Sequence, residues 1–139
     1  IEGYAQIGAI LGGGSKKEVE DLGKYGKVLG MLIMLRDDLI DMIDVEEARH
    51  RIERESLPLP VIYALQNPKT KSAIAPFLLK RKPTRKDAEF IVQKTHEADG
   101  IRRCQELMRR LTKEAYTYLK GVKYNKEELE LLLRAVVHL

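Results

Sequence analysis

The sequence predicts an all-α protein. Apolar residues recur at intervals of three and four along much of the chain, which is the period of a helix with one buried side. Aromatic residues make up only 6% of the chain, tryptophan is absent, and the alternation typical of strands is nearly missing. Several segments also carry helix-start signals, so we expect six or seven helices packed as an antiparallel bundle.

The first strong helix-start signal follows a run of three glycines at residues 12–14. Ser15 and Glu18 have the spacing of a capping box, in which each side chain bonds the other residue's backbone amide. The helix that begins there is expected to continue to Ile43. Its apolar residues first form a stripe and then run almost continuously over residues 29–35. A helix that is apolar on all sides is typical of the middle of a bundle.

The middle of the chain predicts two short helices. Two prolines precede the first, which is expected over residues 61–65, and Asn67-Pro68 ends it. The second is expected over residues 72–79. The polar stretch 80–86 then reads as a loop.

One long helix is expected over residues 87–122, because its apolar positions form a single stripe. Thr84 opens it through a second capping box, and Gly121 is well placed to end it. Gly100 lies inside this helix as a weak or kinked point. A similar start signal at residues 125–128 opens the last helix.

Length and composition limit the possible classes. The chain has 139 residues, 44% of them hydrophobic and 33% charged, which is the balance of one folded domain without a dividing linker. Its only cysteine, Cys104, excludes a disulfide framework and favours a reducing, cytoplasmic compartment, where it packs as a small hydrophobe. No segment has the length of a membrane span. The first residue is Ile1 and not Met, so we expect processing or a piece of a longer protein.

Three aspartates stand at the end of the most apolar helix. Asp37 and Asp41 are four residues apart and project from one helical face, while Asp38 is rotated by roughly 100°. Such close carboxylates repel one another unless a hard divalent cation such as Mg²⁺ joins them to substrate phosphates. The alternative is a solvated acidic turn, because acidic residues continue to Glu47. Spacing alone leaves both interpretations open.

The order of motifs resembles the C-terminal half of the trans-isoprenyl diphosphate synthases, the polyprenyl synthetase family that includes farnesyl and geranylgeranyl diphosphate synthases. The resemblance is carried by a glycine-rich segment at 8–14, Leu29-Gly30, the aspartates at 37–41 and the Ser-Leu-Pro segment that begins at Ser56. It implies an α-helical isoprenoid synthase fold, with residues 1–139 as its C-terminal portion. It also implies that Asp37, Asp38 and Asp41 bind Mg²⁺.

The same resemblance implies the activity and the partners. The family condenses isopentenyl diphosphate with an allylic diphosphate held between two aspartate-rich motifs, and it forms homodimers. The first of these motifs is absent from residues 1–139, so this chain has half an active site and we expect it to be inactive alone.

The sequence also departs from the family pattern. Ile33 and Met34 stand where the family has Phe-Gln, and the stretch after Asp41 is short and lacks the usual lysines. Arg54, with Arg49 and Arg51 as alternatives, is expected to contact diphosphate in their place, since guanidinium groups suit phosphate oxygens.

These departures favour a second interpretation, in which the chain is a divergent, non-catalytic partner subunit of a synthase. A third is a basic helical module that binds nucleic acid, suggested by the basic clusters near residues 80–86 and 102–110. Because acidic residues are interleaved with these clusters, we interpret them as a solvated face and expect no nucleic-acid partner.

Overall fold

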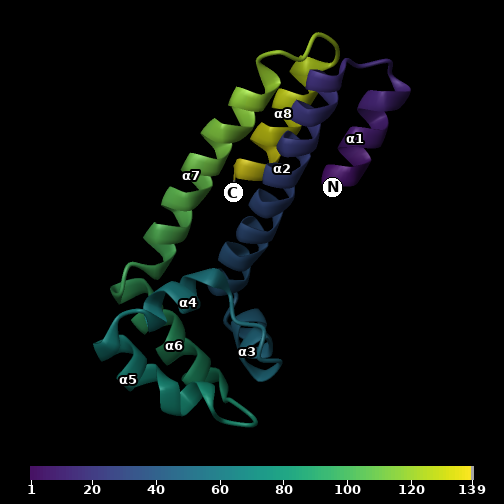
Figure 1. Cartoon of the computed structure of the whole chain (residues 1–139). Helices are drawn as coiled ribbons and strands as arrows, with labels where there is room; N and C mark the ends of the chain where they lie inside the picture. The colour runs from purple at the N-terminus through teal and green to yellow at the C-terminus, as the bar shows by residue number, and fades with distance from the viewer. Residues whose placement is uncertain (139) are drawn as a thin grey trace. The chain divides into compact units, whose positions relative to one another are not determined.

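The protein is all-α, as the sequence predicts, in a computed structural model that describes residues 1–138 (Figure 1). Within those residues there are eight helices and no strands. The helices are α1 (Glu2–Leu11), α2 (Lys16–Ile43), α3 (Val45–Glu53), α4 (Leu59–Leu65), α5 (Pro68–Leu78), α6 (Arg85–Glu97), α7 (Gly100–Leu119) and α8 (Lys126–Val137). No helix in this part of the chain is both long and apolar enough to cross a bilayer.

The chain forms two compact units, and each boundary between them falls inside a helix. The first unit contains residues 1–36 and those from 107 onward, which include α1, α8 and most of α2 and α7. The second unit contains residues 37–106, with α3 to α6 and the remaining ends of α2 and α7. The three aspartates and the three candidate arginines all belong to the second unit.

In the first unit, α1 lies alongside α2 at positions where α2 carries glycines (Figure 1). A Cβ atom added at Gly26 would lie 2.9 Å from the Ala5 Cβ, and one added at Gly23 would lie 2.7 Å from the Gln6 amide nitrogen. Glycine is therefore needed for this close approach. Across the same unit the Tyr25 hydroxyl donates to the Leu129 carbonyl at 2.7 Å, which ties α2 to α8.

The sequence predicts that the apolar stretch of α2 is buried on all sides. In the structure it is buried on only part of its surface. Leu32 is fully buried in the first unit, whereas Met34 is 70% exposed and Met31 is 41% exposed. The difference arises because neighbours within residues 1–138 cover only part of the circumference of the helix. The exposed methionines leave an apolar strip on α2.

The second unit is built around a small core where α3 to α6 meet. Its fully or nearly fully buried members are Met42, Ile52, Val61, Ile74, Ala88 and Ile91. The rings of Phe77 and Phe90 pack beside it with centroids 4.9 Å apart. This core holds the end of α2 against the short helices that follow it.

The long helix predicted over residues 87–122 is two helices, α6 and α7, which raises the number of helices above the expected six or seven. The chain turns at Asp99, whose φ is 59°, and α7 begins at Gly100. A Cβ at Gly100 would lie 2.3 Å from the Pro60 carbonyl oxygen, so the backbone of α4 occupies the place of a side chain. Gly100 thus marks a break and a close contact.

Two other boundaries differ from the sequence prediction. The short stretch after Asp41, for which the sequence predicted no helix beyond Ile43, is mostly the helix α3. Asn67 does more than end a helix, since its side chain accepts hydrogen bonds from the amides of Lys69 and Thr70 and opens α5 at once. This is the N-cap arrangement, which provides acceptors for the free amides of a helix start.

Two of the three predicted capping signals are confirmed. Ser15 and Glu18 exchange hydrogen bonds of 3.3 and 3.2 Å, and Thr84 and Asp87 form a complete capping box. Asn125 precedes α8 but has a φ of 57° and makes no side-chain capping bond, so it serves as a left-handed turn residue. Asparagine tolerates that conformation better than most residues do.

Asp87 should make the stability of the protein depend on acid pH. Its pKa is lowered, first by the hydrogen bond from the Thr84 amide and then by Lys80, whose Nζ lies 3.0 Å away. A lowered pKa in the folded state gives stability that is present above the ordinary pKa of aspartate, about 3.9, and is lost as pH falls through the lowered value. The stability of Asp87→Asn, measured by thermal melting between pH 2 and 7, is expected to change less with pH than that of the unmodified protein. An identical pH profile would contradict this assignment.

Candidate functional site

The aspartates lie in the last turns of α2, and two of them meet one arginine from α3. Arg51 donates from Nη2 to the Asp38 carboxylate at 2.8 Å and from Nη1 to the Asp41 carboxylate at 2.6 Å. The side chains of Asp38 and Arg51 are only 18% and 21% exposed, so this ion pair is partly shielded from water. The helix turn therefore brings Asp38 and Asp41 together around a positive charge.

The third nitrogen of the Arg51 guanidinium and the second oxygen of Asp38 are also used. Arg51 Nε donates to the Ser56 carbonyl at 2.7 Å, and the Leu59 amide donates to Asp38 at 2.9 Å. Leu59 is the first residue of α4, where Pro58 offers no side-chain cap. A carboxylate at a helix N-terminus satisfies a free amide and favours the helix dipole. Asp38 thus caps the start of α4 although it lies 21 residues earlier in the sequence.

The turn between α3 and α4 is shaped to present these groups. The amides of Glu55 and Ser56 bond back to the carbonyls of Ile52 and Arg51, which is the Schellman ending of a helix. Glu55 occupies the left-handed position of this motif, with a φ of 57°. Glycine usually takes that position, because a Cβ atom there costs about 1–2 kcal/mol.

Replacement of Glu55 by glycine is expected to stabilise the protein. Relief of the left-handed strain exceeds the extra backbone freedom that glycine gives the unfolded chain, so the net gain is about 0.5–1 kcal/mol. Urea unfolding of Glu55→Gly and of Glu53→Gly provides the comparison, since Glu53 lies in the last turn of the regular helix. There the same change should destabilise. A gain in neither variant would show that Glu55 is unstrained.

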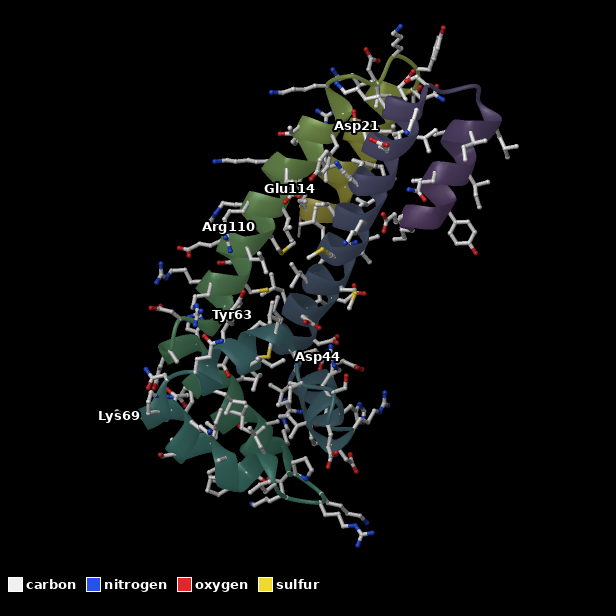
Figure 2. The ribbon with its side chains drawn as sticks, in the orientation of Figure 1. Asp21, Asp44, Tyr63, Lys69, Arg110 and Glu114 are labelled. Atoms are coloured by element: carbon white, nitrogen blue, oxygen red, sulfur yellow. The ribbon has the colours of Figure 1, made fainter. Side chains whose placement is uncertain are left out.

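Asp37 differs from the other two aspartates. It is exposed, and among residues 1–138 it forms neither an ion pair nor a side-chain hydrogen bond of the kinds found at Asp38 and Asp41. The acidic run that follows is also separate, because Asp44 accepts from the amides of Glu46 and Glu47 as the N-cap of α3. Figure 2 labels Asp44 at this start of α3. The solvated acidic turn of the alternative interpretation therefore has a structural role of its own.

The other two arginines have different surroundings. Arg49 donates to Glu46 at 3.1 Å and to Glu53 at 3.3 Å along the surface of α3. Arg54 is exposed just after α3 and has no ion-pair partner in the described part of the chain. Of the three arginines named by sequence, Arg51 is committed to aspartates, Arg49 to glutamates, and Arg54 to neither.

The electrostatics at the site follow from these contacts. Burial alone would lower the pKa of Arg51, but its hydrogen bonds to Asp38 and Asp41 outweigh burial and raise that pKa above its ordinary value. Cys104, in the same unit, is fully buried, and burial together with the Asp38 charge raises the pKa of its thiol to about 11. Cys104 is therefore a packed, unreactive thiol, as expected from the sequence.

The donor set suits a hard cation, although the arrangement is not a finished metal centre. Carboxylate oxygens are the ligands that Mg²⁺ prefers, and two of them already converge on the guanidinium charge of Arg51. No group of three or more acidic, histidine or cysteine side chains stands ready to hold a metal within residues 1–138. Arg51 bonds one oxygen of Asp38 and one of Asp41, so a cation at those oxygens would compete with it.

The sequence named Arg51 only as a contact for diphosphate and missed its bonds to Asp38 and Asp41. It also missed the Leu59 amide. A usable signal was present, because α4 begins with prolines and without the serine, threonine or asparagine that usually caps a helix. A helix start without its own cap needs an acceptor from elsewhere.

Comparison with known proteins finds relatives of one class. It is 30% identical over 101 residues to heptaprenyl diphosphate synthase component 2 of Bacillus subtilis, covering 69% of this chain and 28% of the relative. It is 29% identical over 133 residues to the protein of the same name from Geobacillus stearothermophilus, covering 91% and 40%. Geranylgeranyl pyrophosphate synthase 12 of Arabidopsis thaliana is 43% identical over 47 residues, covering 34% and 13%. No family model matches the chain.

These relatives and the all-α fold agree on one class, the prenyl diphosphate synthases. In sequence the chain is similar to one part of the trans-isoprenyl diphosphate synthases. It spans between 13% and 40% of the length of the three relatives described.

Proposed function

We propose that this chain supplies a Mg²⁺-binding aspartate cluster to a prenyltransferase that condenses isopentenyl diphosphate with an allylic diphosphate. The observation that carries the proposal is the convergence of Asp38 and Asp41 on one positive charge at the end of α2. The relatives named as prenyl diphosphate synthases support the same chemistry. Because the chain spans less than half of each of these relatives, the activity is proposed for the complete synthase.

Asp37, Asp38 and Asp41 would hold the metal, and each would contribute hard carboxylate oxygens. When bound, Mg²⁺ neutralises the charge that a diphosphate leaving group develops. The chain's own residues would bind the diphosphate and orient it. The core of the second unit fixes the end of α2, and α3 brings arginines to the same end.

The arginines are proposed to bind the diphosphate itself. Arg54 is the best placed for this role, since its guanidinium is exposed and unpaired within the described residues. Arg49 is held by two glutamates and would have to exchange those bonds for phosphate oxygens. A planar guanidinium favours such an exchange because it forms paired hydrogen bonds to phosphate.

A partner subunit is the second candidate function. Two of the relatives are named component 2, a name for one part of a synthase made of several. The Ile33-Met34 pair in place of Phe-Gln also favours a subunit that lacks part of the substrate site.

A homodimer, by contrast, is proposed from the family resemblance alone. A cytoplasmic location is proposed from the single buried thiol.

Metal removal separates these candidates. The protein made from its native gene is incubated with labelled isopentenyl diphosphate and an allylic diphosphate, with Mg²⁺, with EDTA, and with Mg²⁺ restored. Transfer that falls at least about 100-fold in EDTA and recovers supports the proposed enzyme. Transfer that appears only after another synthase component is added supports the partner subunit. Absence of transfer under all these conditions contradicts both.

A basic module that binds nucleic acid is the third interpretation. Three of the nine cations in its clusters form ion pairs, since Lys80 bonds Asp87, Arg85 bonds Glu89 and Arg102 bonds Glu106. These ion pairs and the interleaved acidic residues reduce the attraction to phosphates, so binding to duplex DNA should be weak. This pairing favours the solvated-face interpretation.

A further inference from the structure

Arg51 is the counter-ion of Asp38 and Asp41. All three guanidinium nitrogens donate hydrogen bonds, to Asp41 at 2.6 Å, to Asp38 at 2.8 Å and to the Ser56 carbonyl at 2.7 Å. Two of these three acceptors are oxygens of the proposed metal ligands. A divalent cation and Arg51 therefore compete for the same charge.

A metal ion and Arg51 cannot both use the oxygens of Asp38 and Asp41 that Arg51 now bonds. Mg²⁺ coordinates carboxylate oxygens at about 2.0–2.1 Å, close enough that a guanidinium bonded to the same oxygens would be repelled. Of the acceptors of Arg51, only the Ser56 carbonyl would be left once a metal took the aspartates. The Arg51 guanidinium would then leave the aspartates of α2 and pair with another anion.

The position of Arg51 decides which anion that is. Its side chain is 21% exposed, so it can leave the aspartates for solvent without unfolding α3. A diphosphate held by that metal would bring negative charge to the same end of α2, and the released guanidinium would pair with it. A guanidinium pairs with phosphate oxygens as readily as with carboxylates.

We propose that Arg51 couples metal binding to diphosphate binding, by neutralising Asp38 and Asp41 in the empty site and transferring to the diphosphate once a divalent cation displaces it. This inference rests on the proposed function. The metal alone then binds weakly, because it must first displace Arg51. Diphosphate strengthens metal binding by giving Arg51 a new partner, and linkage requires that the metal strengthen diphosphate binding by the same factor.

The coupling predicts opposite effects from a single substitution. In Arg51→Met the aspartates have no competing cation, so the affinity for the metal alone should rise, while the affinity for diphosphate in the presence of metal should fall. If about a tenth of the unmodified protein has Arg51 released, the rise is roughly tenfold. An arginine that merely supports the structure would lower both affinities when removed.

The experiment measures Mn²⁺ binding by electron paramagnetic resonance and inorganic pyrophosphate binding by equilibrium dialysis at saturating Mn²⁺. Arg102→Met is the matched control, because Arg102 also bridges two carboxylates, those of Asp99 and Glu106, in the same unit. We expect about tenfold tighter Mn²⁺ binding and at least fivefold weaker pyrophosphate binding in Arg51→Met, and no change in either affinity in Arg102→Met.

Equal Mn²⁺ affinities in the unmodified protein and in Arg51→Met would overturn the coupling and leave the proposed function standing. Failure of both proteins to bind Mn²⁺, with or without pyrophosphate, would overturn the proposed function and the coupling together. Thermal melting checks that the variant folds, and Arg51→Lys is a milder second variant. Lysine retains one charge without the fork, so it should give a smaller rise in Mn²⁺ affinity.

Discussion

Replacement of Asp38 by alanine is expected to lower the free energy of unfolding by about 2 kcal/mol. The substitution removes the acceptor for the Leu59 amide at the start of α4 and leaves Arg51 with only one of its two carboxylates. Removal of one member of a fully buried ion pair costs more than this, but both side chains here are about one-fifth exposed, and water screens part of the loss. Urea unfolding measures the change directly.

Asp37→Ala is the matched control for this prediction. Asp37 is next in sequence and carries the same charge, but it is exposed and lacks the partners of Asp38. Its replacement should change the free energy of unfolding by less than about 0.5 kcal/mol. Equal stabilities for the two variants would mean that the bonds of Asp38 to Arg51 and Leu59 contribute nothing to the fold.

Gly100→Ala is expected to have the largest effect on stability, a loss of about 3 kcal/mol. The new Cβ would lie 2.3 Å from the Pro60 carbonyl oxygen and 2.9 Å from the Thr95 side chain, so backbone must shift on one side of the contact. The start of α4 would move with Pro60, and with it the Leu59 amide that Asp38 caps. Thermal melting of the variant checks the prediction.

Gly8→Ala provides the comparison, because it changes the same residue type in open space. A Cβ at Gly8 meets nothing within 4 Å, and Gly8 lies inside α1. Alanine is the better helix former by about 1 kcal/mol, so this variant should be slightly more stable than the unmodified protein. If Gly100→Ala were also as stable as the unmodified protein or more so, the close contact between Gly100 and Pro60 would be contradicted.

The helical fold could be predicted because local signals determine most of it. The capping boxes at Ser15 and Thr84 and the three-and-four spacing of apolar residues depend only on neighbours in sequence. The sequence indicated Gly100 as a weak or kinked point, but the complete break there could not be predicted in the same way. It depends on the carbonyl of Pro60, a residue forty positions earlier, which only the tertiary structure brings into contact.

The candidate site was partly predictable for the same reason. The spacing of Asp37, Asp38 and Asp41 is local, and it indicated a cation site at the end of α2. The choice of carboxylates that come together is not determined by local sequence, because it depends on the position at which α3 turns back. The pairing of Asp38 and Asp41 through Arg51 follows from that turn.

Asp37 gives the most direct test of the proposed function, because it is the one member of the cluster whose removal should leave the fold intact. The decisive measurement is the rate of prenyl transfer by the Asp37→Ala variant of the native gene product at saturating Mg²⁺. A metal-binding role predicts a loss of at least about 100-fold with an unchanged melting temperature. A rate within twofold of the unmodified protein, at the same melting temperature, would contradict the assignment of these aspartates to the metal.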